Sequence, residues 1–189
     1  MILVCISQKL MRASVLTAIA LFCYLVTITP SYADITDVRN FYQFSDNVLS
    51  AGQPKRRQLE RVSEDSIEVV INIVPAYESI YEPDEAEILR KQGIEYIHTP
   101  VNWESPKASE IENFLVAMKK VDDRKVLVHC WVNARASALV HVYQMTQSSE
   151  NQAVEYESLR VIWDDIAGFS LDNNDTWQQV IKEYAVETN

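Results

Sequence analysis

Short apolar runs alternate with segments of helical periodicity along most of the chain after residue 33. Ile67–Val74 is rich in β-branched residues, which is typical of a strand buried on both faces, whereas Ile94–Val101 alternates apolar and polar residues like a half-buried strand. The expected strands are Val48–Ala51, Ile67–Val74, Ile94–Val101 and Lys125–Val128. The expected helices are Pro54–Ser63, Asp84–Gln92, Ser109–Val121, Arg135–Thr146, Gln152–Trp163 and Asp175–Ala185.

Strands and helices alternate as far as the helix that begins at Arg135, and two more helices follow it. This order is typical of parallel strands joined by crossover helices. The pattern therefore predicts an α/β fold with a mainly parallel central sheet of four to five strands and helices on both faces.

The first 33 residues have a different character. A short basic segment precedes a nearly uninterrupted apolar run, Ala13–Ile28, and small residues then occupy Ser31 and Ala33, the two positions that a signal peptidase reads. We therefore expect a signal peptide over residues 1–33, one domain over residues 34–189, and a secreted or periplasmic protein. A retained membrane anchor is the alternative, since the run approaches the ~20 residues of a membrane span.

Charge and cysteine content narrow the range of partners. The whole chain has a net charge of −10, and the leader is basic, so its removal would make the protein more acidic. Such a chain repels nucleic acid and anionic lipid, so we expect no nucleic-acid partner and no stable membrane association after leader removal. Cys130 would then be the only cysteine, which rules out an internal disulfide.

The segment around Cys130 is the most informative for chemistry. Cys130 follows a buried strand, and a short loop leads from it into the helix that begins at Arg135. Ligand sites in parallel sheets lie at such strand ends, and the free N–H groups at a helix start favour anions and a reactive thiolate. Arg135 would add a two-pronged donor for an oxyanion. A buried core cysteine beside a surface arginine is the simpler alternative.

Other residues near this loop are expected to contact the substrate or to orient the loop. We call the loop from Cys130 to Arg135 the cradle. His129 would orient the cradle through hydrogen bonds, Ser137 would donate a hydrogen bond to the Cys130 sulfur, and Trp131 would line the entrance of the cradle. The expected substrate-binding residues are His129, Trp131, Val132, Asn133, Ala134, Ser137 and Gln53.

These residues carry a resemblance to a known family. The segment from His129-Cys130 to Arg135-Ala136-Ser137 resembles the signature of cysteine-dependent protein tyrosine and dual-specificity phosphatases. Leu49–Pro54 and Gly93–Val101 extend a resemblance to secreted bacterial phosphatase-like proteins related to the beta-lactamase-hydrolase-like phosphatase domain. The resemblance implies a phosphatase-type α/β fold and a phosphate-ester substrate, phosphotyrosine or a small aryl phosphate. It also implies that Cys130 forms a cysteinyl-phosphate and that Arg135 holds the transferred phosphoryl group.

The loop departs from the phosphatase pattern in one respect. The standard signature has five residues between cysteine and arginine, whereas four separate Cys130 from Arg135 here. A six-residue loop is also the length found in rhodanese-like sulfurtransferases, which carry a persulfide on the same cysteine. A sulfurtransferase and a catalytically weak oxyanion-binding module therefore remain as alternatives.

A phosphatase of this kind needs an acid for the leaving oxygen. Glu104 follows the third expected strand, and parallel strand ends converge, so Glu104 is the expected general acid. Glu78, Glu82, Asp84 and Glu85 form a second group of candidates. We expect no cofactor and no metal site, because His98, His129, His141 and Cys130 lack any recognised ligand spacing.

Overall fold

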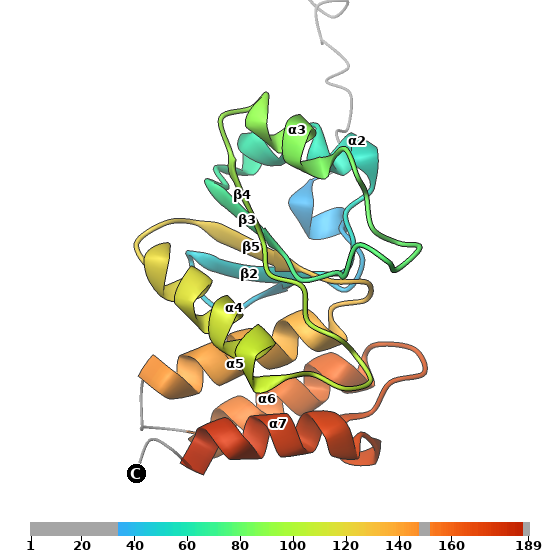
Figure 1. Cartoon of the computed structure of the whole chain (residues 1–189), viewed down its shortest axis with the longest axis vertical. Coiled ribbons are helices and arrows are strands. Elements are labelled where there is room, and N and C mark those ends of the chain that lie inside the picture. The colour runs from blue at the N-terminus through green and yellow to red at the C-terminus, as the bar shows by residue number, and fades with distance from the viewer. Residues whose placement is uncertain (1–33, 148–151, 187–189) are drawn as a thin grey trace, which may run out of the picture. The chain divides into compact units, whose positions relative to one another are not determined.

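A computed structural model describes residues 34–147 and 152–186 of the chain, which form a five-stranded sheet with helices on both faces (Figure 1). The order of the strands is β1-β2-β5-β3-β4. The edge strand β1 is antiparallel to β2, and the other neighbours are parallel. The strands are β1 (Tyr42–Gln43), β2 (Val48–Ala51), β3 (Val69–Asn72), β4 (Glu95–His98) and β5 (Val126–His129). The expected mainly parallel α/β fold is confirmed.

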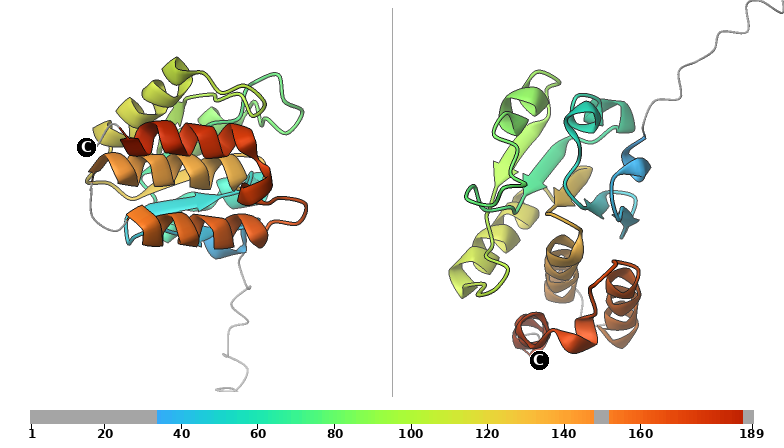
Figure 2. Two further views of the ribbon diagram at one scale, coloured as in Figure 1. Left: turned by 90° about the horizontal axis from the view of Figure 1, so that it is seen from below. Right: turned by 90° about the vertical axis from the view of Figure 1, so that its right-hand side faces the viewer.

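The helices are divided between the two faces of the sheet. The short helices α2 and α3 cover one face, while α4 and α5 cover the other, with α6 and α7 packed against α5 (Figures 1 and 2). The α-helices are α2 (Arg56–Leu59), α3 (Glu85–Arg90), α4 (Ala108–Lys120), α5 (Ala134–Gln147), α6 (Gln152–Asp164) and α7 (Asp175–Val186). The 3-10 helices are η1 (Ile35–Asp37), η2 (Val62–Asp65) and η3 (Leu171–Asn173).

Alternation along the central strands builds a separate apolar core on each face. In β3, Val69 and Ile71 belong to the core beneath α4 and α5, whereas Val70 belongs to the core beneath α2 and α3. In β5, Val128 and Leu127 divide in the same way. Because side chains alternate along a strand, the runs of Val, Ile and Leu supply both layers at once. Cys130 follows β5 on the α4–α5 side.

The structure differs from the sequence expectations in two local respects. The expected helix over Pro54–Ser63 is divided into α2 and η2, and η2 is followed by Ser66, which has a left-handed backbone with φ of 60°. The two-residue strand β1 was not expected.

The expected signal peptide lies outside the described residues. Within the described residues, no helix has the length and apolar character needed to cross a bilayer.

Candidate active site at the end of strand β5

Residues Cys130–Asn133 form the loop between β5 and α5, and backbone contacts with β2 and its extension fix its course. The Cys130 N–H donates to the Ala51 carbonyl at 3.2 Å, and the Gln53 N–H donates to the Trp131 carbonyl at 3.0 Å. Gly52 is required here, because a Cβ atom at this position would lie 2.8 Å from the Trp131 carbonyl oxygen.

Several N–H groups of the loop are available to an external acceptor. Among the described residues, no hydrogen bond takes up the N–H groups of Trp131, Val132, Ala134 or Arg135. The last two belong to the first turn of α5, where N–H groups have no partner within the helix. A set of free N–H groups at a helix start is suited to an anion.

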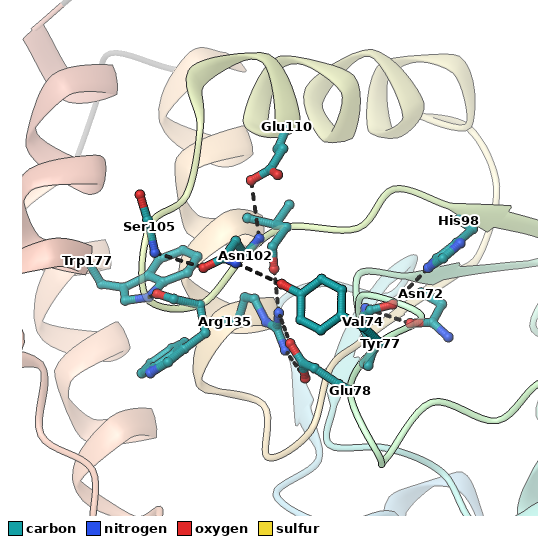
Figure 3. A network of polar contacts seen from close by, with 12 residues as sticks. Asn72, Val74, Tyr77, Glu78, His98, Asn102, Ser105, Glu110, Arg135 and Trp177 are labelled. Atoms are coloured by element: carbon teal, nitrogen blue, oxygen red, sulfur yellow. Dashed lines mark hydrogen bonds and ion pairs between the residues drawn. The ribbon is translucent and has the colours of Figure 1, made fainter.

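Arg135 is 3% exposed and is held at two of its three nitrogens (Figure 3). Its Nη1 and Nη2 atoms donate to the two carboxylate oxygens of Glu78, each at 3.0 Å, and Nη1 also donates to the Val101 carbonyl. These contacts use three of the five N–H donors of the guanidinium. Nε has no partner among the described residues. The Nε–H and the remaining Nη2–H lie on one edge of the group and form a second, unused fork.

A pocket of about 480 Å³ adjoins both residues. Although Cys130 is only 1% exposed, it lines this pocket with Arg135 and Glu104. The rest of the wall is largely aromatic and comprises Tyr77, Trp103, Trp131 and Phe169 among its members. Arg135 is the only cationic residue among the lining residues.

The C-terminal helices support this aromatic wall. Trp103 stacks on Trp177 of α7 at a ring-centroid distance of 5.3 Å and also contacts Trp163 of α6. The Trp177 Nε1–H donates to the Trp103 carbonyl at 3.1 Å (Figure 3). Both α6 and α7 therefore help to position the loop that follows β4.

Of the carboxylates considered as general acids, Glu104 differs from the rest. Its side chain is exposed at the pocket and makes no hydrogen bond or ion pair with the described residues. Each of the other four has a partner. Glu78 binds Arg135, Glu82 and Asp84 lie beside Arg56, and Glu85 contacts His129. Glu104 is thus the carboxylate of this set that is free to exchange a proton with a bound ligand.

Comparison with solved structures shows the family. A DUF442 protein from Shewanella putrefaciens CN-32, named as a candidate phosphatase, matches with 31% sequence identity and a TM-score of 0.70. The match covers 79% of this chain and 91% of that one. The chain belongs to the DUF442 family.

More distant structures match this chain in fold alone. Tk-PTP in its active form has 21% identity and a TM-score of 0.62, with 78% of this chain and 97% of that one covered. The core catalytic domain of the PP-IP phosphatase SIW14 from S. cerevisiae has 14% identity and a TM-score of 0.61, with 78% and 86% covered. These matches confirm the phosphatase-type fold. No protein-family model and no curated protein sequence matches the chain.

His129 of this chain lies outside the pocket, at the end of β5. Its Nε2 lies 2.6 Å from Glu85 Oε1, and both side chains are fully buried. The other oxygen of Glu85 accepts from the Nδ2 of Asn72 at 2.8 Å and from the Nε2 of Gln53 at 3.4 Å. This carboxylate joins β3, the end of β5 and the segment after β2, so it stabilises the position from which the loop begins.

Asn133 stabilises the loop in a different way. It has a φ of 77°, a left-handed conformation that asparagine tolerates better than most residues. Its Nδ2 donates to the Asn40 carbonyl at 2.6 Å, while the Nδ2 of Asn40 donates to the Val132 carbonyl at 2.8 Å. The reciprocal pair fastens the loop to the segment before β1.

The structure therefore divides the sequence-predicted site residues into two groups. Those that line the pocket are Cys130, Arg135, Glu104, Trp131, Val132 and Ala134. Those that do not line it are His129, Asn133, Ser137 and Gln53. The Ser137 hydroxyl donates to the Ala134 carbonyl at 3.0 Å, which differs from the expected contact with the sulfur.

Sequence reasoning missed several partners of the site residues. Glu78 and Glu85 were candidates for the acid, but the structure assigns them to Arg135 and His129. Their position after β3 could have indicated these contacts, because the ends of the parallel strands β3 and β5 are neighbours in the sheet. Asn40 and Tyr77 gave no sequence signal. In the described residues, no group of three or more His, Cys, Asp or Glu side chains is arranged to hold a metal ion.

Proposed function

We propose that this DUF442 protein is a cysteine-dependent phosphatase that hydrolyses phosphate monoesters through a cysteinyl-phosphate. The observation that carries the proposal is the shared pocket of Cys130, the unused fork of Arg135 and the free N–H groups of the loop. These groups match the needs of phosphoryl transfer, which are a nucleophile and several donors for the equatorial oxygens.

In the proposed cycle, the Cys130 thiolate attacks phosphorus as the bond from phosphorus to the leaving oxygen breaks. Arg135 and the loop N–H groups bind the three equatorial oxygens, and Glu104 gives its proton to the departing alcohol. Glu104 then takes a proton from water as that water attacks phosphorus. The sulfur–phosphorus bond breaks, and inorganic phosphate and the thiolate are released. The cycle uses no cofactor.

The walls of the pocket favour an aryl ester. Aromatic side chains surround the space beyond the cradle, and Arg135 is the single cation among the lining residues. An aromatic alcohol would stack on these rings, whereas a polyphosphorylated alcohol would find no second cation in the pocket. We therefore propose phosphotyrosine or a small aryl phosphate as the substrate class.

The test compares the wild type with Cys130→Ser on phenyl phosphate. The wild type should release phosphate, and the variant should release none while keeping the wild-type circular dichroism spectrum and melting temperature. A wild-type protein that releases no phosphate from any of a broad panel of monoesters would refute the proposal. Intact mass after thiosulfate treatment tests the sulfurtransferase alternative, with which the six-residue span from Cys130 to Arg135 is also compatible. One added sulfur on Cys130 would support that alternative.

We also propose that the protein is exported and that cleavage after Ala33 leaves Asp34 as its first residue. The small residues Ser31 and Ala33 after the apolar run support this. The intact mass of the protein recovered from a periplasmic or culture-supernatant fraction checks the cleavage site, and a full-length mass there would contradict it.

A further inference from the structure

Two loops meet across the pocket through an exposed tyrosine. Tyr77 lies in the loop after β3, and its hydroxyl accepts a hydrogen bond from the Nδ2 of Asn102, in the loop after β4, at 2.7 Å (Figure 3). The Tyr77 side chain is 73% exposed, so burial in a core does not hold it there. Both residues line the pocket of Cys130.

The same two loops also hold Arg135. Glu78 and Val101, the neighbours of Tyr77 and Asn102 in the sequence, both accept hydrogen bonds from its guanidinium (Figure 3). The loops are therefore joined at two adjacent points. One of these holds the cation of the pocket, and the other is the bond between Tyr77 and Asn102.

Asn102 controls the turn that carries Glu104. Its side-chain oxygen accepts from the Ser105 N–H at 2.9 Å, and its own N–H donates to Glu110 of α4 at 3.2 Å (Figure 3). Glu104 lies inside this turn, and its carboxylate has no partner among the described residues. Its position therefore depends on the backbone of the turn, which Tyr77 holds through Asn102.

We infer that Tyr77 is a positioning residue, which places Glu104 over Cys130 by holding Asn102. This inference rests on the proposed function and extends it. Proton donation by Glu104 matters most when the leaving alcohol is a poor leaving group. Loss of the Tyr77 hydroxyl should therefore slow the departure of such alcohols selectively.

The test uses Tyr77→Phe, which removes one exposed hydroxyl and keeps the ring. kcat/KM, which covers the steps up to departure of the alcohol, is measured for benzyl phosphate and for p-nitrophenyl phosphate. For benzyl phosphate we expect a loss of about tenfold or more, and for p-nitrophenyl phosphate a loss of about twofold or less. Glu104→Gln should show the same selectivity with a larger loss.

Tyr42→Phe is the matched control, because Tyr42 lies on the edge strand β1 and outside the pocket. This variant should keep the wild-type kcat/KM on both esters. Equal losses on the two esters in Tyr77→Phe, or no loss on either, would overturn the inference, as would Glu104→Gln without selectivity. Hydrolysis of p-nitrophenyl phosphate that depends on Cys130 shows in the same experiment that the proposed function itself holds.

Discussion

Single residues with unusual backbone or unusual partners set the shape of the cradle. With four residues between Cys130 and Arg135, the chain must turn sharply, and Asn133 supplies the turn with a φ of 77°. Glycine adopts this conformation at the lowest energetic cost, but a glycine here would lack the side chain that donates a hydrogen bond to the Asn40 carbonyl. Asparagine therefore combines the turn with an anchor.

Asn133→Ala should destabilise the fold more than Asn133→Gly. Alanine pays the left-handed backbone cost of about 1 kcal/mol and also loses the bond to Asn40, whereas glycine loses only the bond. Urea unfolding of both variants measures the difference, which we expect to be about 1 kcal/mol. Equal stabilities, or a more stable alanine variant, would show that the backbone at this position is not left-handed in solution.

The residue scale is also where the sequence was least informative. Cys130, Arg135 and Glu104 were predicted to share a site because each follows a strand of one parallel sheet, and the structure places them around one pocket. The partners of Arg135 and His129 were not predicted. Glu78 lies 57 positions from Arg135, and Glu85 lies 44 positions from His129. The order of the strands limits the carboxylate partners of Arg135 and His129 to the acids that follow β3. Which acid pairs with which residue depends on the conformation of that loop.

At the scale of elements, burial determined which boundaries were predictable. β2 was predicted with its observed bounds. β3 lies within the expected Ile67–Val74, because a buried run of β-branched residues has few alternatives to a strand. Strand β1 has two residues and is held by its antiparallel pairing with β2, so it has no periodic pattern to read. Helix α2 lies within the expected Pro54–Ser63 but has only four residues, so its end was not predicted.

Helix α5 contains a titratable group within its apolar packing. His141 is 1% exposed, its ring contacts Tyr156 of α6, and its Nε2 has no partner among the described residues. Burial lowers the pKa of His141 to about 4. The unfolded chain takes up a proton near pH 6.5 that the folded chain resists, so stability is lost as the pH falls from about 6.5 towards 4.

His141→Leu should remove this part of the acid sensitivity. From pH 7 to pH 4.5, the wild type should lose about 2 to 3 kcal/mol of unfolding free energy more than the variant loses. Urea unfolding at the two pH values measures both losses, and the carboxylates that titrate in this range are common to both proteins. Equal losses would mean that His141 takes up a proton in the folded state as readily as in the unfolded chain.

At the scale of the whole molecule, the site has to bind an anion within an acidic protein. The chain has a net charge of −10, and Arg135 is the only cation among the residues that line the pocket of Cys130. A neighbouring groove, which shares Ser79, Ile80 and Trp131 with that pocket, includes the cations Arg39, Lys55 and Arg56, but also Asp37 and Glu82. Over distances longer than this groove, the field of the molecule repels a phosphate ester, while the cradle attracts it only at close range.

Salt should therefore accelerate the reaction of an anionic substrate. Raising the ionic strength from about 0.01 M to 0.1 M shortens the Debye length from about 30 Å to about 10 Å. This change screens the distant carboxylates more than the contacts within the cradle. We expect kcat/KM for phenyl phosphate to rise a few-fold while kcat changes little, because the approach of the substrate is affected and the bound complex is not.

Alkylation of Cys130 provides the control, since its rate should rise with salt for anionic iodoacetate and stay constant for neutral iodoacetamide. A fall in kcat/KM with salt would mean instead that Arg135 and the three cations of the neighbouring groove dominate the potential along the approach, and that the acidic surface does not govern access to the cradle.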